Sequence, residues 1–203
     1  MSNTYGNFYG YTGVFPIIND KKRNISHARS LRSLLSDMDN GGGSLFSRTG
    51  LIHGARLFVL DDVVYNGHPS KEEHLEYEYL VFSLTFDGEL DEMAQRLSEY
   101  GGNDFESVFQ HCYGFDAGNM SSEFMLKFLQ TGQITTSFLY VEADGDLQET
   151  MRALLAKRYI AQMLEKAQFL TTEEKKALVR TTASSIASAA LPLPGDFDER
   201  GAL

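Results

Sequence analysis

Two stretches decide the fold of this chain: LIHGARLFVLDD at residues 51–62 and EYLVFSLTFDGE at residues 78–89. Both are rich in β-branched and aromatic residues, a composition typical of buried strands. We expect them to pair as antiparallel strands, at about 51–61 and 78–86, across a long polar connection. Pairing about the centre of that connection would place His53 opposite Asp87 and Phe58 opposite Phe82.

Outward from this pair, the spacing of apolar residues predicts further strands and helices. Two more strands are expected at 11–18 and 134–141, with Pro16 causing a bulge or one-sided pairing in the first. Residues 1–10 should form an aromatic arm, and 191–203 a loose tail. Helices are expected at 27–39, 89–100, from Asn103 to about 112, from Ser122 to Gly132, at 147–168 and at 172–190. Gly101 and Gly102 should break the second helix from the third, which Asn103 would cap.

The expected strands and helices follow one another in the order βαββαβ, with further helices at the C-terminus. This order predicts an α+β fold, a ferredoxin-like antiparallel sheet with helices on one face. We expect a ferredoxin-like domain over residues 1–170 and a C-terminal helix with a flexible tail over residues 171–203. The other face of the sheet needs cover from the C-terminal helices, the N-terminal arm or a second subunit. The chain is therefore expected to form a homo-oligomer.

Charge and composition exclude several classes of function. The 203 residues carry a net charge of −10, which argues against broad binding to nucleic acid. The single cysteine, Cys112, forms no intrachain disulfide and fits a reducing compartment. The N-terminus lacks the pattern of a signal peptide, and no apolar run approaches the roughly 20 residues of a membrane span. We expect a cytoplasmic protein with neither a nucleic-acid partner nor a membrane span.

The candidate catalytic residues are His53, Arg56 and Asp87. A carboxylate beside an imidazole fixes its tautomer and favours its charged form. Arg56 lies three residues from His53, on the opposite face of a regular strand, but a bulge at Gly54 would bring the two side chains to one face. Each residue also has a structural explanation. His53 fits a hydrogen-bonded strand histidine, Arg56 fits a partner of a nearby acid, and Asp87 fits a turn or cap residue.

His111 and Cys112 form a second concentration of reactive side chains. Cys112 falls on an apolar helical stripe, which favours a buried, inert thiol. His111 ends a helix, where a cation is favoured, and it is also a weak candidate for binding a cofactor. We considered a metal site formed by His53, His111 and Asp87, but the spacing gives it no support, so no metal is predicted. The sequence does not name a cofactor.

Several segments resemble a group of bacterial proteins of uncharacterised activity with a ferredoxin-like fold. They are VFPI at 14–17, HGAR and LFVLDD at 53–62, YLVFSLTFDGEL at 79–90 and FQHCYGF at 109–115. The group has His-Phe-Ala-Arg where this chain has His53-Gly54-Ala55-Arg56, so an aromatic ring is missing beside His53. The resemblance spans residues 10–145 and implies an α+β barrel type of fold. Related barrels include haem peroxidases, monooxygenases and binding proteins, so the resemblance implies no single activity.

Three hypotheses about function follow. The first is a ligand-binding α+β barrel protein with an apolar cavity and a polar anchor at His53 or Arg56, with a small molecule as partner. The second is an oxidoreductase, haem-dependent or cofactor-free, that uses His53, Arg56 and Asp87. The third is an assembly protein whose C-terminal helix and tail dock on a protein partner. Because no motif demands chemistry, binding or assembly ranks above catalysis.

Overall fold

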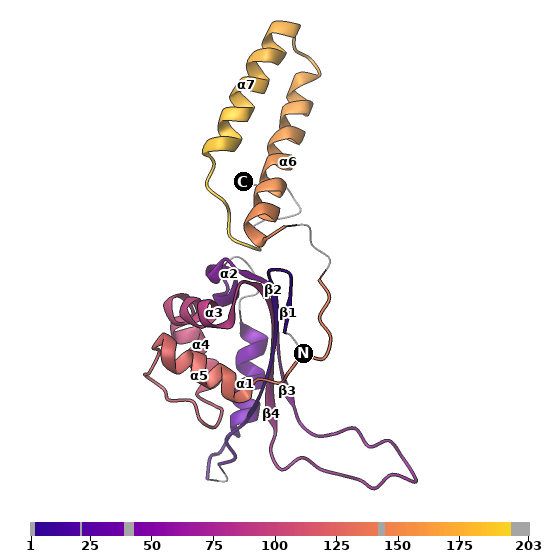
Figure 1. Cartoon of the computed structure of the whole chain (residues 1–203), viewed down its shortest axis with the longest axis vertical. Helices are drawn as coiled ribbons and strands as arrows, with labels where there is room; N and C mark the ends of the chain where they lie inside the picture. Colours follow the sequence, from indigo (N-terminus) through magenta and orange to yellow (C-terminus); the bar gives the residue numbers. More distant parts are fainter. Residues whose placement is uncertain (1–2, 21, 39–42, 142–144, 196–203) are drawn as a thin grey trace.

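A computed structural model describes all residues except 1–2, 21, 39–42, 142–144 and 196–203. The chain is a mixed α+β protein built on a four-stranded antiparallel sheet (Figure 1). The strands are β1 (Thr4–Tyr5), β2 (Phe8–Pro16), β3 (Ile52–Leu60) and β4 (Tyr79–Asp87). The helices are α1 (His27–Asp37), α2 (Leu45–Thr49), α3 (Leu90–Arg96), η1 (Leu97–Gly101), α4 (Gly102–Phe109), α5 (Ser122–Gly132), α6 (Leu147–Ala167) and α7 (Thr172–Ser188).

The strands lie in the order β1-β2-β4-β3, and β4 is central as expected. The register of β3 against β4 is one residue from the prediction, because Phe58 pairs with Val81 and not with Phe82. A long connection constrains register far less than a tight turn does. No bulge forms at Pro16, the last residue of β2, which pairs within the sheet on one side, with Tyr79 of β4, as one of the two expectations had it.

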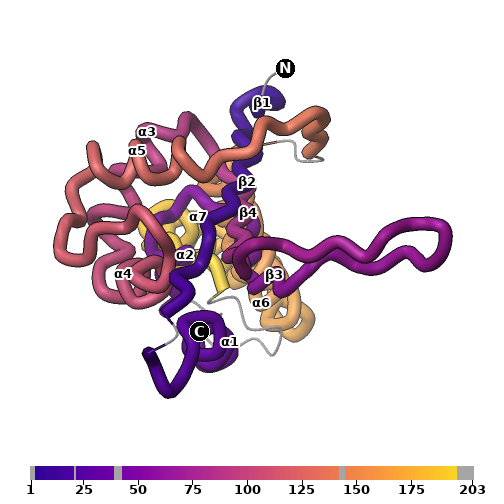
Figure 2. Tube along the Cα trace, turned by 90° about the horizontal axis from the view of Figure 1, so that it is seen from below, coloured from indigo at the N-terminus to yellow at the C-terminus, as the bar shows by residue number. Residues whose placement is uncertain are grey.

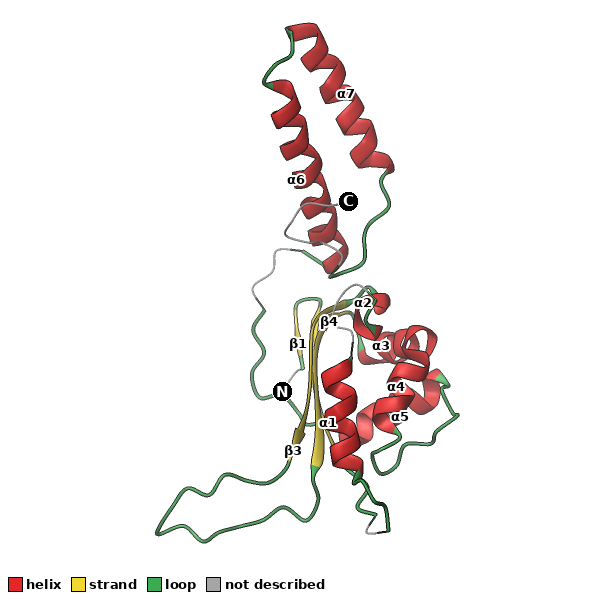
Figure 3. Ribbon diagram, turned by 180° about the vertical axis from the view of Figure 1, so that it is seen from behind, coloured by secondary structure: helices red, strands yellow, loops and turns green. Residues whose placement is uncertain are grey.

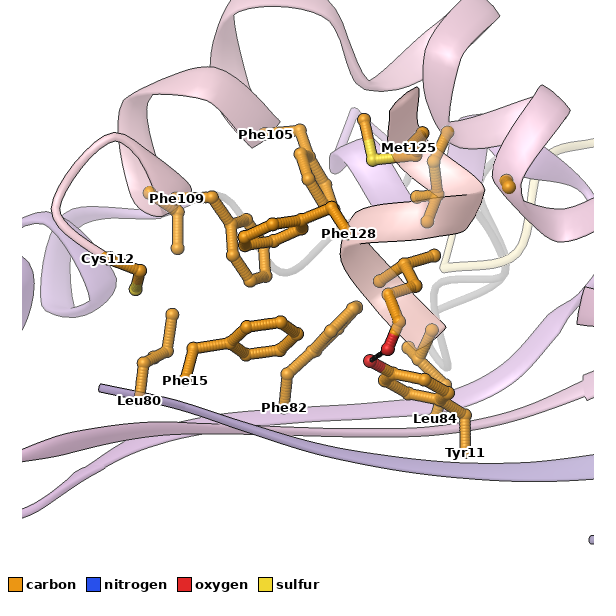
Figure 4. Close-up of a cluster of buried hydrophobic side chains, with 14 of the residues drawn as sticks. Tyr11, Phe15, Leu80, Phe82, Leu84, Phe105, Phe109, Cys112, Met125 and Phe128 are labelled. Atoms are coloured by element: carbon orange, nitrogen blue, oxygen red, sulfur yellow. Dashed lines mark hydrogen bonds between the residues drawn. The ribbon is translucent and has the colours of Figure 1, made fainter. Parts of the chain in front are cut away.

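Aromatic side chains fill the space between the sheet and helices α3 to α5 (Figure 4). Phe82 on β4 packs edge-on against Phe109 of α4, and Phe15 on β2 stacks on Phe128 of α5 with ring centres 4.6 Å apart. The buried Tyr11 hydroxyl donates a hydrogen bond of 2.8 Å to the Leu129 carbonyl, and burial raises the pKa of this phenol. These contacts join the sheet to the helices that cover one of its faces.

Two helical features differ from the prediction. The short helix α2 begins at its N-cap Ser44 and ends at Gly50, which adopts a left-handed conformation with φ of 69°. The expected break is present at Gly102, whose φ of 45° and ψ of −136° are not helical, but a π-helical turn, η1, precedes it and follows α3 directly. Gly102 is the first residue of α4, so Asn103 is not its cap.

The expected strand at 134–141 is also wrong. A bridge joins Gln133, the residue before this segment, to Gly13, and the Ile134 amide donates to the Thr12 carbonyl. No residue from 134 to 141 is part of a strand. Beyond that point β1 pairs with the start of β2, and the amide of Gly10 donates to the Asn3 carbonyl. The N-terminal residues thus occupy the edge of β2 that the segment would need to continue as a strand.

Two parts project from this core. Helices α6 and α7 pack on each other as a hairpin beyond one end of the sheet, and residues 61–78 project beyond the other (Figures 1 and 2). Thr171 and Glu174 form a capping box at the start of α7. The domain boundary expected at residue 170 falls in the connection between α6 and α7. Of the predicted loose tail, residues 196–203 lie outside the described part.

Candidate functional site

His53 is the extra residue of a bulge on strand β3. The pairing of β3 with β4 shifts between Ile52, which pairs with Phe86, and Gly54, which pairs with Thr85. A bulge re-aims the side chain of the extra residue. The His53 ring consequently lies beside Phe8 of β2, edge-on, with ring centres 5.0 Å apart. Gly54 tolerates the irregularity without crowding, since no atom lies within 4 Å of the position a Cβ would take.

Asp87 ends β4 and uses both carboxylate oxygens. One oxygen lies 2.9 Å from Nε2 of His53, and the other accepts a hydrogen bond of 2.8 Å from the Leu147 amide. Leu147 is the first residue of α6, whose N-terminus favours a nearby negative charge. The Asp87 amide itself donates to the Leu51 carbonyl, and the residue is only 5% exposed. The predicted contact between His53 and Asp87 is present, and it includes a third partner that the sequence did not reveal.

Arg56 lies away from this pair. It pairs with Ser83 on β4, four residues before Asp87, which at about 3.3 Å per residue is about 13 Å along the strand. Its guanidinium lies over the ring of Phe58 at 5.0 Å from the ring centre. Among the described residues, Arg56 forms no hydrogen bond or ion pair with His53 or Asp87.

A groove of about 400 Å³ opens beside His53. Its apolar lining comes from Leu35 and Met38 of α1, Phe46 of α2 and Leu57 of β3, with the His53 ring at its edge. At one side, the Ser47 hydroxyl donates a hydrogen bond to the Pro194 carbonyl. The segment after α7 therefore returns to the core here. This groove is where a small molecule or cofactor could contact His53.

His111 does not approach His53 or Asp87. Its Nδ1 lies 2.8 Å from Nδ1 of His27, the first residue of α1. Burial, the neighbouring ring and Arg23 lower the pKa of His111, while burial and Arg23 lower that of His27. His27 could not be predicted as a partner of His111, because 84 residues separate the two histidines. Burial raises the pKa of the adjacent Cys112 thiol to about 12, as expected for an inert thiol.

A separate polar cluster closes the base of the projecting residues 61–78. The carboxylate of Asp62 accepts hydrogen bonds from the Leu75 amide at 2.8 Å and from the Val63 amide at 2.9 Å, and it lies 2.6 Å from Nδ1 of His74. The hydrogen bond with His74, followed by the two amides, lowers the pKa of Asp62 to about 2. All of these contacts join residues of the loop itself, which indicates a structural role.

Among the described residues, no group of three or more histidine, cysteine, aspartate or glutamate side chains is arranged to hold a metal ion. None of the helices in the described ranges is long and apolar enough to cross a membrane. Comparison of the chain with protein-family models, with curated proteins and with solved structures finds no significant match.

Proposed function

We propose that this chain is a non-catalytic assembly protein of the ferredoxin-like type, in which further copies of the chain cover the helix-free face of the sheet. The observation that carries the proposal is a set of strongly exposed apolar side chains beside that face. Val64 is 85% exposed and Phe138 is 83% exposed. Large contiguous apolar surfaces on a protein commonly mark interaction sites.

The position of these residues supports one continuous interface. The projecting loop and segment 134–141 both lie on the side of the sheet opposite α1 and α3 to α5 (Figure 3). Between them is the helix-free face, with the exposed Phe58 on β3. The hairpin of α6 and α7 stands beyond the end of the sheet and leaves this face open (Figure 1). A second copy could offer the same surface across a twofold axis, as most homodimers do.

The ferredoxin-like assignment rests on the order of elements. Strands β2, β3 and β4 with the intervening α1 and the following α3 to α5 have the order βαββα. Gln133 and Ile134 then contact the outer edge of β2, where a ferredoxin-like sheet places its last strand. In this interpretation the last strand is reduced to one bridge.

The assembly proposal is tested by sedimentation velocity on the full chain. Val64→Ser combined with Phe138→Ser should shift the protein towards the monomer, because both residues would lie in the interface. Phe169→Ser is the matched control, since Phe169 is 91% exposed but lies between α6 and α7. An unchanged sedimentation coefficient in the double variant, or an equal shift in the control, would contradict an interface on the sheet face.

A second candidate function is binding of a small molecule in the groove beside His53. Its apolar lining and single imidazole match the common composition of ligand pockets. The oxidoreductase alternative has less support, because both oxygens of Asp87 already accept hydrogen bonds and Arg56 lies over Phe58. An absorption spectrum of the purified protein separates these alternatives. A Soret band would support haem chemistry at this site. A featureless visible region would exclude the haem-dependent oxidoreductase.

A further inference from the structure

A second groove, of about 620 Å³, lies between α1 and the end of α4. Its lining includes Arg23 and Arg29 at one end, Ser30 and Ser33 along α1, and His111 beyond α4. Asp37, at the other end of α1, is the only carboxylate among the lining residues. Eight residues of helix separate Asp37 from Arg29, which is about 12 Å at 1.5 Å per residue. One end of this groove is therefore positively charged in a chain whose net charge is −10.

The two arginines are available to a ligand. Within the described ranges, neither Arg23 nor Arg29 forms an ion pair with a carboxylate, whereas Arg32 and Arg48 do. One nitrogen of the Arg23 guanidinium lies 3.0 Å from both Nδ1 and Nε2 of His27, so Arg23 donates to the neutral His27 ring. Guanidinium groups match the geometry of phosphate oxygens and bind them through paired hydrogen bonds. The N-terminal turn of α1 adds a positive potential at the same end.

The histidine pair at this end is one proton short of its charged form. A hydrogen bond between the two Nδ1 atoms needs one proton, so in the neutral pair only one of the two Nε2 atoms carries hydrogen. One added proton leaves that hydrogen bond in place and makes both Nε2 atoms donors. The charged His27 ring then no longer accepts from Arg23, which releases the guanidinium to a ligand. Burial and Arg23 oppose this charge on both rings, and His27 also opposes it on His111, whereas Asp20 favours it on His27. A bound anion would favour it strongly.

We propose that this groove binds the phosphate group of a small molecule between Arg23 and Arg29, and that binding is coupled to uptake of one proton by the pair of His27 and His111. The hydroxyls of Ser30 and Ser33 offer neutral donors beside the arginines. Asp37 repels an anion from the far end, which directs the phosphate to the arginine end. This site is independent of the proposed assembly surface, which lies on the opposite side of the sheet.

The proposal is tested by titrating the full chain with inorganic phosphate in an isothermal calorimeter, at pH values of about 6 and about 7.5. Measurement in two buffers of different ionisation enthalpy reports the protons taken up. We expect saturable binding with a dissociation constant at or below about 1 mM, weaker at the higher pH by up to about tenfold per pH unit. Sulfate, which keeps its charge over this range, distinguishes protonation of the protein from protonation of phosphate. Its binding should show the same pH dependence.

Variants make the proposal specific. Arg29→Gln should weaken binding at least about tenfold, while Arg180→Gln, the same charge change on α7, should leave it unchanged. His111→Asn, and separately His27→Asn at a less buried position, should remove the proton uptake. Equal weakening by both arginine changes would show diffuse charge attraction and overturn the proposal. No saturation up to about 10 mM phosphate, or proton uptake that persists in both histidine variants, would also overturn it.

Discussion

At the scale of single residues, Asp87 joins three parts of the molecule through one buried side chain. It ends β4, holds the His53 ring of β3, and accepts the first amide of α6. A buried carboxylate needs such partners, because an unsatisfied one carries the full cost of lost hydration. The arrangement therefore couples the edge of the sheet to the C-terminal hairpin.

Removing one partner of Asp87 should lower the free energy of unfolding. His53→Ala is expected to cost about 1–3 kcal/mol, because it leaves the buried carboxylate short of a donor. His53→Gln should cost less, since its amide can still donate. Urea unfolding of both variants measures this, with His68→Ala on the exposed loop as the control. A loss for His53→Ala no larger than for His68→Ala would show that the hydrogen bond contributes little.

The histidine pair should make stability depend on pH. Both rings have a pKa below their ordinary value of 6.5 in the folded protein, so the unfolded chain binds more protons in that range. The contribution of the two histidines to the free energy of unfolding is complete above about pH 6.5. It is lost as the pH falls through their lowered pKa values in the folded protein. Unfolding in phosphate-free buffers between about pH 5 and pH 8 measures it. On acidification, the free energy of unfolding of the double variant His27→Asn/His111→Asn should fall less than that of the unmodified chain. If the two fall equally, groups other than these histidines cause the pH dependence.

The two residue pairs show what sequence reasoning can reach at this scale. His53 and Asp87 could be paired in advance because they lie on neighbouring strands of strong β composition. The contact of His27 with His111 could not, because a helix start and a helix end meet only through packing of α1 against α4. The hydrogen bond from the Leu147 amide to Asp87 could not be predicted for the same reason, because the sequence of α6 does not indicate that its first residue contacts β4.

At the scale of elements, local composition predicted most strands and helices. The expected strand at 134–141 does not form, because β1 occupies the edge of β2 that it would need. Residues 134–141 have the composition of a strand, yet β1 and Asn3 take the bonding positions that would extend it. The side chain of Leu139 instead lies over Gly10, where a Cβ would come within 2.8 Å of it. The register of β3 differed by one residue because residues 61–78 are too long to set it.

Close packing between β2 and the end of α5 should make Gly132 sensitive to substitution. In Gly132→Ala the new methyl group would overlap the ring of Phe15, which is 2% exposed and stacked on Phe128. We expect a loss of about 1–3 kcal/mol in the free energy of unfolding, measured with urea. Gly54→Ala is the matched control, because open space surrounds its Cβ position, and it should be neutral or stabilising by about 0.4–1 kcal/mol. A tolerated Gly132→Ala would mean that Phe15 moves easily.

At the scale of the whole molecule, a helix-covered sheet with one open face and two projecting parts explains the proposed assembly. Each copy carries a net charge of −10, so self-association must overcome electrostatic repulsion. Raising the salt concentration from about 0.05 M to about 0.5 M should therefore tighten association. Sedimentation equilibrium at both concentrations measures the change. Dissociation on adding salt would instead indicate an interface held by ion pairs and would contradict an apolar one.

The most direct test of the assembly proposal is a native mass spectrum of the unmodified full chain at micromolar concentration. We predict a dominant species of two or more copies of the 22.7 kDa chain, each at the mass of the polypeptide or with a small retained ligand. A monodisperse monomer would contradict the proposal that a second copy covers the helix-free face of the sheet.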